Sequence, residues 1–149
     1  MKCSVKWIDS HKTGGSAMSF LAETESGHLV TMDGAPDGGG RNLAPRPMEM
    51  ILAGAGGCTA YDVVLILKRG RHAISGCEVE LLAERATEDP KVFVRIAYRF
   101  RVYGHKLAEA AVARAIELSH DKYCSATAML AKGATIETAF DIIETGPAA

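Results

Sequence analysis

The chain has 149 residues, about the length of one domain, and its 48% hydrophobic and 23% charged residues are ordinary values for a soluble globular protein. The formal net charge of −1 excludes the positive excess on which nucleic-acid binders depend, so we expect no nucleic-acid partner. The N-terminus has no apolar run of signal-peptide length. We therefore expect the four cysteines in the reducing cytoplasm, where working cysteines are typically redox-active, catalytic or metal-binding.

The first part of the chain predicts strands and one long loop. Cys3, Val5 and Trp7 alternate with polar residues, as in a half-buried strand, and residues 13–16 are typical of a turn. A loop rich in glycine and proline follows over residues 33–47, and loops of this length are often functional or mobile. The patterns together predict strands over residues 3–7, 18–24 and 28–32.

A long apolar segment predicts a helix over residues 47–68. Pro47 suits the first helical position, and Glu49 lies in the first turn, where the helix dipole favours negative charge. Apolar residues lie on nearly every side, which predicts a long buried central helix. A membrane span is disfavoured because Glu49 and Asp62 would have to enter the bilayer, so we expect no membrane partner.

The middle of the chain predicts an antiparallel hairpin. Residues 77–84 and 92–102 alternate apolar and charged side chains, with the turn residues Asp89 and Pro90 between them. Because a one-residue slip would bury the charges, we predict a single register and a solvated charged face without a binding role. In this register the facing residues are Glu84 and Arg95, Glu80 and Arg99, and Glu78 and Arg101.

The last part of the chain predicts helices and a final strand. The predicted helices cover residues 106–118 and 124–131, with a break at 119–122, and the strand covers 135–143. Strands thus occur before, between and after helices without regular βαβ alternation. This order predicts an α+β fold, in a single domain over residues 1–149.

The four cysteines occupy different positions in this pattern. Cys3 and Cys77 fall on the apolar faces of strands and are predicted to be core residues. Cys58 follows the small residues 54–57, which let a substrate or another backbone come close. Cys124 opens a short helix, whose N–H groups favour the reactive thiolate. From the residues alone, close helix packing with Cys58 as filler and plain burial of Cys124 remain alternatives.

A metal site is not predicted from the spacing of candidate ligands. His120 precedes Cys124 by four residues, but zinc sites normally have closely spaced ligand pairs, often two of them. Phosphate-loop, dinucleotide-binding and metalloprotease motifs are also missing from the sequence. We therefore expect neither a metal nor another cofactor.

Three segments resemble the OsmC/Ohr family, and the matching order of N-terminal strands, central hairpin and closing strand extends this likeness over nearly the whole chain. The segment before Cys58 resembles the first family signature, in which a proline and a glutamate open a long helix that leads to a cysteine. The segment around Cys124 resembles the second signature, and the glycine-rich loop is most similar to the YhfA-like branch. In letters, these segments are PRPMEMILAGAGGC at 45–58, DKYCS at 121–125 and GGRNL at 39–43.

The resemblance implies an OsmC-like fold in an intertwined homodimer, without metal or haem. In peroxidase members the first cysteine, here Cys58, attacks the O–O bond of an organic hydroperoxide and becomes a sulfenic acid. The second cysteine, here Cys124, condenses with it to a disulfide, which an external dithiol reduces. An arginine stabilises the thiolate, and a glutamate holds that arginine in place.

Two features of the chain depart from the peroxidase members. Their glutamate directly follows the proline, whereas Met48 has that position here and Glu49 comes one residue later, which turns the side chain by about 100°. In addition, no arginine precedes Arg41, so Arg41 and Arg46 are the available substitutes, and the flexible loop favours Arg41.

The predicted function is a thiol peroxidase, and the alternatives are a non-catalytic dimer that binds a small molecule and a thiol redox sensor. The predicted catalytic residues are Cys58, Cys124, Arg41 and Glu49.

Overall fold

A computed structural model of the chain describes residues 1–8 and 18–147. The chain divides into two compact units, Met1–Leu52 and Ala53–Ala149. The turn predicted at residues 13–16 lies outside the described residues, and the expectation of a single domain over residues 1–149 stays a prediction.

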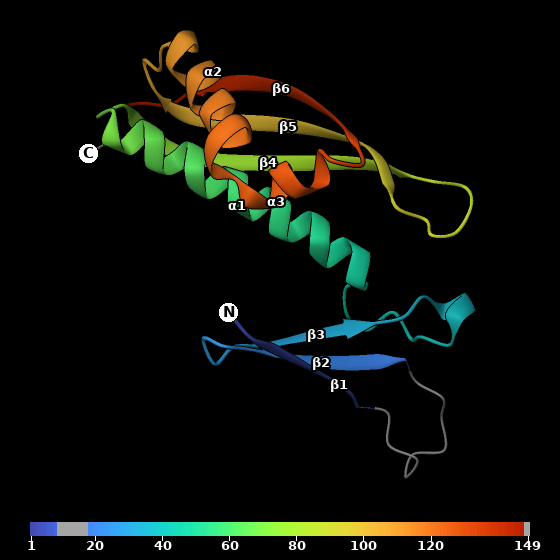
Figure 1. Cartoon of the computed structure of the whole chain (residues 1–149). Helices are drawn as coiled ribbons and strands as arrows, with labels where there is room; N and C mark the ends of the chain where they lie inside the picture. The colour runs from blue at the N-terminus through green and yellow to red at the C-terminus, as the bar shows by residue number, and fades with distance from the viewer. Residues whose placement is uncertain (9–17, 148–149) are drawn as a thin grey trace. The chain divides into compact units, whose positions relative to one another are not determined.

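The first unit contains a three-stranded antiparallel sheet in the order β1-β2-β3 (Figure 1). All three strands begin and end within one residue of the predicted positions. Every residue of the edge strand β1 is exposed, so the prediction that Cys3 lies in the core is wrong. Alternation indicates which face of a strand is apolar, but not whether another element covers that face. The elements are β1 (Cys3–Trp7), β2 (Ser19–Thr24), β3 (Leu29–Asp33) and the 3-10 turn η2 (Pro36–Gly38).

Asp33, at the end of β3, organises the loop that follows this sheet. The buried carboxylate accepts the backbone N–H groups of Leu43 at 3.0 Å, Arg41 at 3.1 Å and Gly34 at 2.8 Å. These hydrogen bonds, led by that of Leu43, hold the pKa of Asp33 below its ordinary value. Gly40 lies directly against the start of the loop, because a Cβ atom there would collide with the backbone of Gly34.

Helix α1 (Pro47–Arg69) begins at the predicted residue and ends one residue later than predicted. Glu49 Oε2 accepts the N–H of Arg46 at 2.9 Å and thereby caps the start of the helix. The sequence predicts burial on nearly every side of this helix. Within a single chain, however, its buried residues lie on one side only. By length and composition α1 could cross a membrane, a test that core helices of soluble proteins also pass. The buried residues of α1 are Ala55, Gly56, Thr59, Val63 and Leu67.

The second unit contains a sheet in the order β4-β5-β6, and its hairpin has the predicted register. Two of the predicted ion pairs form, Arg95–Glu84 at 2.7 Å and Arg101–Glu78 at 3.7 Å. Arg99 pairs instead with Asp141 of β6 at 3.0 Å, because β6 brings additional carboxylates to this charged face. The strands are β4 (Ala73–Arg85), β5 (Phe93–His105) and β6 (Thr135–Glu144).

The pairing of β6 corrects the prediction of antiparallel strands. β6 lies parallel to β5, with Ile136 opposite Ile96 and Ile142 opposite Val102. A crossover through helices carries the chain back to the end of the sheet at which β5 began, and the next strand is therefore parallel. This crossover consists of α2 (Glu109–Leu118), the π-helical turn η3 (Ser119–Tyr123) and α3 (Ser125–Leu130).

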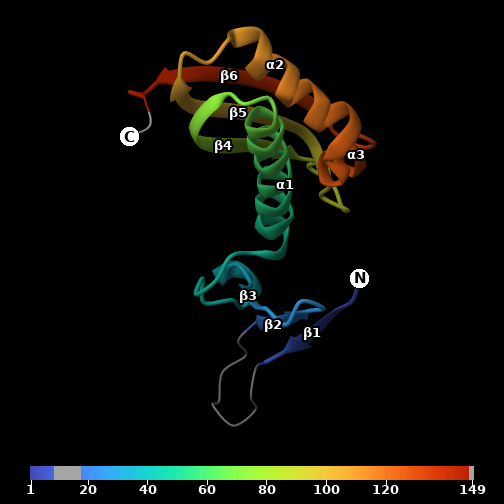
Figure 2. The same cartoon turned by 90° about the vertical axis from the view of Figure 1, so that its left-hand side faces the viewer.

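The helices of the second unit cover one face of its sheet (Figures 1 and 2). Gly56 lets α1 approach β4 closely, because a Cβ atom at this position would lie 2.8 Å from Cδ1 of Leu81. Segregated helices on a mixed sheet confirm the predicted α+β class. The fully buried apolar side chains of this core include Val63, Leu67, Ile96, Tyr98, Phe100, Val102 and Val112.

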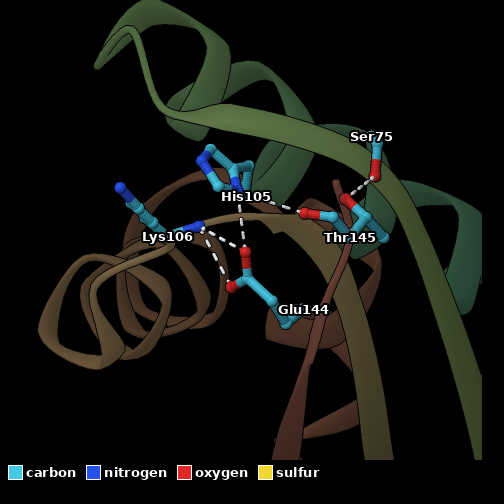
Figure 3. Close-up of polar contacts among 5 residues, drawn as sticks. All are labelled: Ser75, His105, Lys106, Glu144 and Thr145. Atoms are coloured by element: carbon cyan, nitrogen blue, oxygen red, sulfur yellow. Dashed lines mark hydrogen bonds and ion pairs between the residues drawn. The ribbon is translucent and has the colours of Figure 1, made fainter. Parts of the chain in front are cut away.

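Polar contacts around Glu144 join the strand ends at one edge of this unit (Figure 3). The Glu144 carboxylate lies 2.8 Å from Nδ1 of His105 and accepts the N–H of Lys106 at 3.1 Å. The N–H of Lys106 contributes most to lowering the pKa of Glu144. Ser75 and Thr145 form a further hydroxyl pair at 3.1 Å, so β4, β5 and the residue after β6 are all connected here.

Candidate thiol site

Cys58 and Cys124 come from segments far apart in the sequence, and the second unit brings them together. Cys58 is half-buried on α1, whereas Cys124 is 1% exposed and is the N-cap residue of α3. Their sulfur atoms and a carboxylate oxygen of Asp62 all lie within 4.8 Å of one another. Both thiols are free. The prediction that Cys124 opens a short helix is confirmed.

Thr127 of α3 holds the Cys124 sulfur in place, and Tyr98 of β5 in turn contacts Thr127. Sγ accepts the N–H of Thr127 at 3.4 Å and lies 3.1 Å from the Thr127 hydroxyl. That hydroxyl is 3.3 Å from the hydroxyl of Tyr98, whose side chain is buried on β5. The position of Cys124 is therefore set by the helix cap and by the sheet beneath it.

The surroundings of Cys58 favour its neutral thiol. Burial raises the pKa of Cys58, and its hydrogen bond to Cys124 raises the pKa further. A hydrogen bond from the backbone N–H of Ala126 opposes these effects, whereas the charge of Asp62 adds to them. No cation is among the groups of the described chain that shift this pKa.

Asp62 is the site residue that sequence reasoning missed. It lies one helical turn after Cys58, and residues four positions apart share a face of a helix. Ser119 Oγ donates to Asp62 Oδ2 at 3.0 Å. The Ser119 proton is used in this bond, so the Thr59 hydroxyl, 2.9 Å away, must donate to Ser119. The spacing from Cys58 could have identified Asp62, but the hydroxyl chain depends on tertiary contacts.

A cleft of about 220 Å³ lies beside this cluster. Asp62 belongs both to the cluster and to the lining of the cleft, whose other walls are mainly apolar. An amphipathic small molecule would suit such a surface, with its apolar part on the leucine and isoleucine side chains. The remaining lining residues are Leu65, Ile66, Arg69, Leu118 and Tyr123.

The other two predicted catalytic residues belong to the first unit. The backbone N–H of Arg41 binds Asp33, and its side chain is exposed. Glu49 binds the backbone of Arg46, which makes it a helix cap in this unit. The predicted contact of Arg41 with Cys58 stays a prediction.

His120 and Cys77 take no part in the thiol cluster, as far as the described residues show. His120 packs against Tyr98 and Phe100 with ring centroids 5.0 and 5.9 Å away, and its Nδ1 lies 3.3 Å from the Thr138 hydroxyl. Burial lowers the pKa of His120, and none of the described residues forms a hydrogen bond with its buried Nε2. Cys77 is half-buried in β4, close to its predicted core position.

Chemically, the cluster can do two things. The neighbouring thiols can form a disulfide after a modest approach, since bonded sulfurs lie about 2 Å apart. Two sulfurs and a carboxylate oxygen within 4.8 Å are also a set of groups that could hold a metal ion.

Comparison with known proteins gives matches over most of the chain. The family described as OsmC-like protein matches residues 38–139. Protein YhfA of Escherichia coli K12 is 44% identical over 143 residues, which cover 96% of this chain and 98% of the relative. A hypothetical protein from Aquifex aeolicus VF5 is 25% identical with a TM-score of 0.79, over 98% of this chain and 99% of its own.

A more distant structure shows the same fold. An organic hydroperoxide resistance protein OsmC from Legionella pneumophila is 13% identical with a TM-score of 0.68, over 95% of this chain and 97% of its own. The likeness to YhfA and the family match confirm the resemblance predicted from the cysteine segments and the glycine-rich loop. The chain therefore belongs to the OsmC-like protein family.

Proposed function

We propose that the protein is a thiol-dependent peroxidase that reduces organic hydroperoxides with Cys58 and Cys124. The observation that carries this proposal is the approach of the two sulfurs to within 4.8 Å of each other. Structural relatives that are named organic hydroperoxide resistance proteins support the substrate class.

The proposed cycle uses two electrons from the two thiols. The Cys58 thiolate attacks one oxygen of the hydroperoxide, the O–O bond breaks, and the leaving alkoxide takes a proton to become an alcohol. Cys58 is then a sulfenic acid. The Cys124 sulfur attacks it, the S–S bond forms, and the hydroxyl group leaves as water with the proton of the Cys124 thiol. A dithiol reductant restores both thiols.

The proposal assigns Arg41 the role of stabilising the Cys58 thiolate. The groups that act on Cys58 raise its pKa on balance, so the proposed thiolate needs a nearby cation. Arg41 has an exposed side chain, on a loop whose backbone Asp33 holds. The proposed role of Glu49 is indirect, because it fixes the backbone of Arg46 at the start of α1.

We further propose a cytoplasmic homodimer without a membrane or nucleic-acid partner. Several large apolar side chains are exposed in the single chain. A second copy would cover such surfaces, as the intertwined dimer of the family implies. Examples are Val5 and Leu29 in the first unit, and Tyr61 and Leu82 in the second.

Steady-state kinetics with an organic hydroperoxide and dithiothreitol test the function. Wild-type protein should consume the hydroperoxide catalytically, whereas Cys58→Ser should react no faster than the mixture without enzyme. Cys124→Ser should still form a sulfenic acid, detectable with dimedone, but should not form the intramolecular disulfide. Cys77→Ser is the matched control, since Cys77 lies outside the cluster, and it should retain activity.

The second candidate is a thiol redox sensor, favoured by the raised pKa of Cys58. A sensor would form the Cys58–Cys124 disulfide once per oxidation event and would show no sustained turnover. A third reading, a non-catalytic small-molecule binding dimer, predicts neither disulfide formation nor turnover. Full activity in Cys58→Ser would refute both thiol functions.

A further inference from the structure

We propose that Cys58, Asp62 and Cys124 form a binding site for a thiophilic divalent cation, Zn²⁺ in particular, when both cysteines are reduced. The site is distinct in chemistry from the peroxidase reaction, since it needs neither a peroxide nor turnover. The His120–Cys124 pair considered in the sequence does not contribute, because His120 is not in the cluster of described ligand groups.

The spacing of the three ligand atoms suits one small cation. Zn–S bonds of about 2.3 Å at a tetrahedral angle place two sulfurs about 3.8 Å apart. The two sulfurs and the Asp62 oxygen lie within 4.8 Å of one another, so small side-chain movements would suffice. Two soft thiolates favour Zn²⁺ over Mg²⁺ or Ca²⁺, which prefer sites made of oxygen ligands.

Secondary structure already holds each ligand near this arrangement. Cys58 and Asp62 are four residues apart on α1, and therefore project from one face of a continuous helix. Cys124 is fixed at the N-cap of α3, where its sulfur accepts the N–H of Thr127. Metal affinity depends strongly on such support, because flexible ligands must be ordered at each binding event.

The surroundings of Asp62 also suit a cation ligand. Ser119 donates to one oxygen of Asp62 and so orients the carboxylate, which leaves further lone pairs for a cation. Asp62 makes no ion pair with any residue that the structure describes, so its charge is not already neutralised by a lysine or arginine. Asp62 also lines the cleft, which provides an entry path and room for a water molecule as fourth ligand.

Binding and oxidation would exclude each other at this site. Two thiols release two protons when Zn²⁺ binds. If an organic hydroperoxide then oxidises the bound dithiolate, two electrons pass to the O–O bond, two protons are taken up, and the products are the disulfide, an alcohol, water and free Zn²⁺. This release step rests on the proposed peroxidase chemistry, whereas the binding itself does not.

Metal binding is tested on the reduced full-length protein under anaerobic conditions with Co²⁺ as a spectroscopic substitute for Zn²⁺. We expect one equivalent of Co²⁺ per chain, with intense thiolate-to-cobalt charge-transfer absorption that Zn²⁺ displaces. Cys58→Ser and Cys124→Ser should each weaken Co²⁺ binding and at least halve the charge-transfer signal, and Asp62→Asn should weaken Zn²⁺ affinity by about tenfold or more. Cys77→Ser should bind like the wild type.

A second measurement needs no variant in the site. Saturating Zn²⁺ should slow the alkylation of the half-buried Cys58 by iodoacetamide in the wild type, but not that of the exposed Cys3. Unchanged affinity in Asp62→Asn, an undiminished signal in either serine variant, or equal alkylation rates of Cys58 with and without Zn²⁺ would each overturn the three-ligand site.

The two proposals fail separately in these experiments. Metal binding is measured without any hydroperoxide, and hydroperoxide turnover is measured in the presence of a chelator. A protein that binds Zn²⁺ without turnover would retain the metal site and lose the peroxidase assignment, and the reverse result would do the opposite.

Discussion

The two faces of the β4-β5-β6 sheet use polar residues in different ways. On the open face, arginines of β5 pair with carboxylates of β4 and β6, and these side chains are substantially exposed. On the covered face, the hydroxyls of Thr59, Ser119 and Thr127 are buried and form short chains that end at Asp62 and Cys124. Water can replace a lost partner on the first face but not on the second, so the same chemical change should have unequal effects.

The largest effect should come from the apolar part of the covered face. Phe100 is 0% exposed and packs against Tyr98 and His120, so Phe100→Ala should lower the free energy of unfolding by about 3–5 kcal/mol. Glu80→Ala, at an exposed position on the neighbouring strand, is the control and should change it by less than about 0.5 kcal/mol. Urea unfolding followed by circular dichroism measures both. Similar losses in the two variants would contradict the assignment of the core to this face.

Next in size should be the loss of a buried hydroxyl. Ser119→Ala removes the acceptor of the Thr59 hydroxyl and the donor to Asp62, so we expect a loss of about 1–3 kcal/mol in the free energy of unfolding. Ser75→Ala, which breaks the exposed pair with Thr145, should have a much smaller effect. The same urea titration compares them.

A double variant sharpens this result. Adding Thr59→Val to Ser119→Ala should recover part of the loss, because no unpaired hydroxyl would then be buried at Thr59. If the loss of unfolding free energy in the double variant equals the sum of the losses in Thr59→Val and in Ser119→Ala, these residues do not act as one hydrogen-bonded chain.

A smaller effect should appear when the pH is lowered. Burial holds the pKa of His120 below its ordinary value of 6.5, although Asp121 partly opposes this. The unfolded chain therefore binds a proton at His120 more readily than the folded chain does. The stability that depends on neutral His120 is present above pH 6.5 and is lost as the pH falls through the lower pKa of the folded state.

Melting temperatures measured between pH 8 and pH 5 check this dependence. His120→Gln should flatten the curve in this range relative to the wild type. Equal slopes for the two proteins would show that the burial of His120 makes no difference to stability.

The smallest effect should be on the open face. The pKa of Glu137 is lowered mainly by its hydrogen bond with Arg95, so the pair stabilises the fold above pH 4.5 and less as the pH falls through the folded pKa. Arg95→Gln should slightly lower the melting temperature at pH 7 and low salt, and high salt should reduce the difference. Glu80→Gln is the matched control, because no ion pair of Glu80 is found among the described residues. A larger decrease in melting temperature for Glu80→Gln than for Arg95→Gln would contradict the observed pairing.

The local pattern of the sequence largely predicted which residues lie on the covered face of the sheet and which lie on the open face. Alternation over residues 77–84 and 92–102 determines which side chains face solvent, and a slip would reverse every one of them, so the hairpin register was predictable. Pro47 likewise marked the start of α1. Cys3 was wrongly assigned to the core, because an apolar alternation does not reveal whether anything packs on it.

The sequence by itself therefore determined the elements, the family and the two cysteines with working roles in the proposed chemistry. The tertiary structure alone decided the parallel pairing of β6 and the inclusion of Asp62 in the thiol cluster. It also decided the Thr59–Ser119–Asp62 hydrogen bonds. The physical reason is range: propensity and periodicity act over neighbouring residues, whereas a site made by α1, η3 and α3 depends on how helices pack across a sheet.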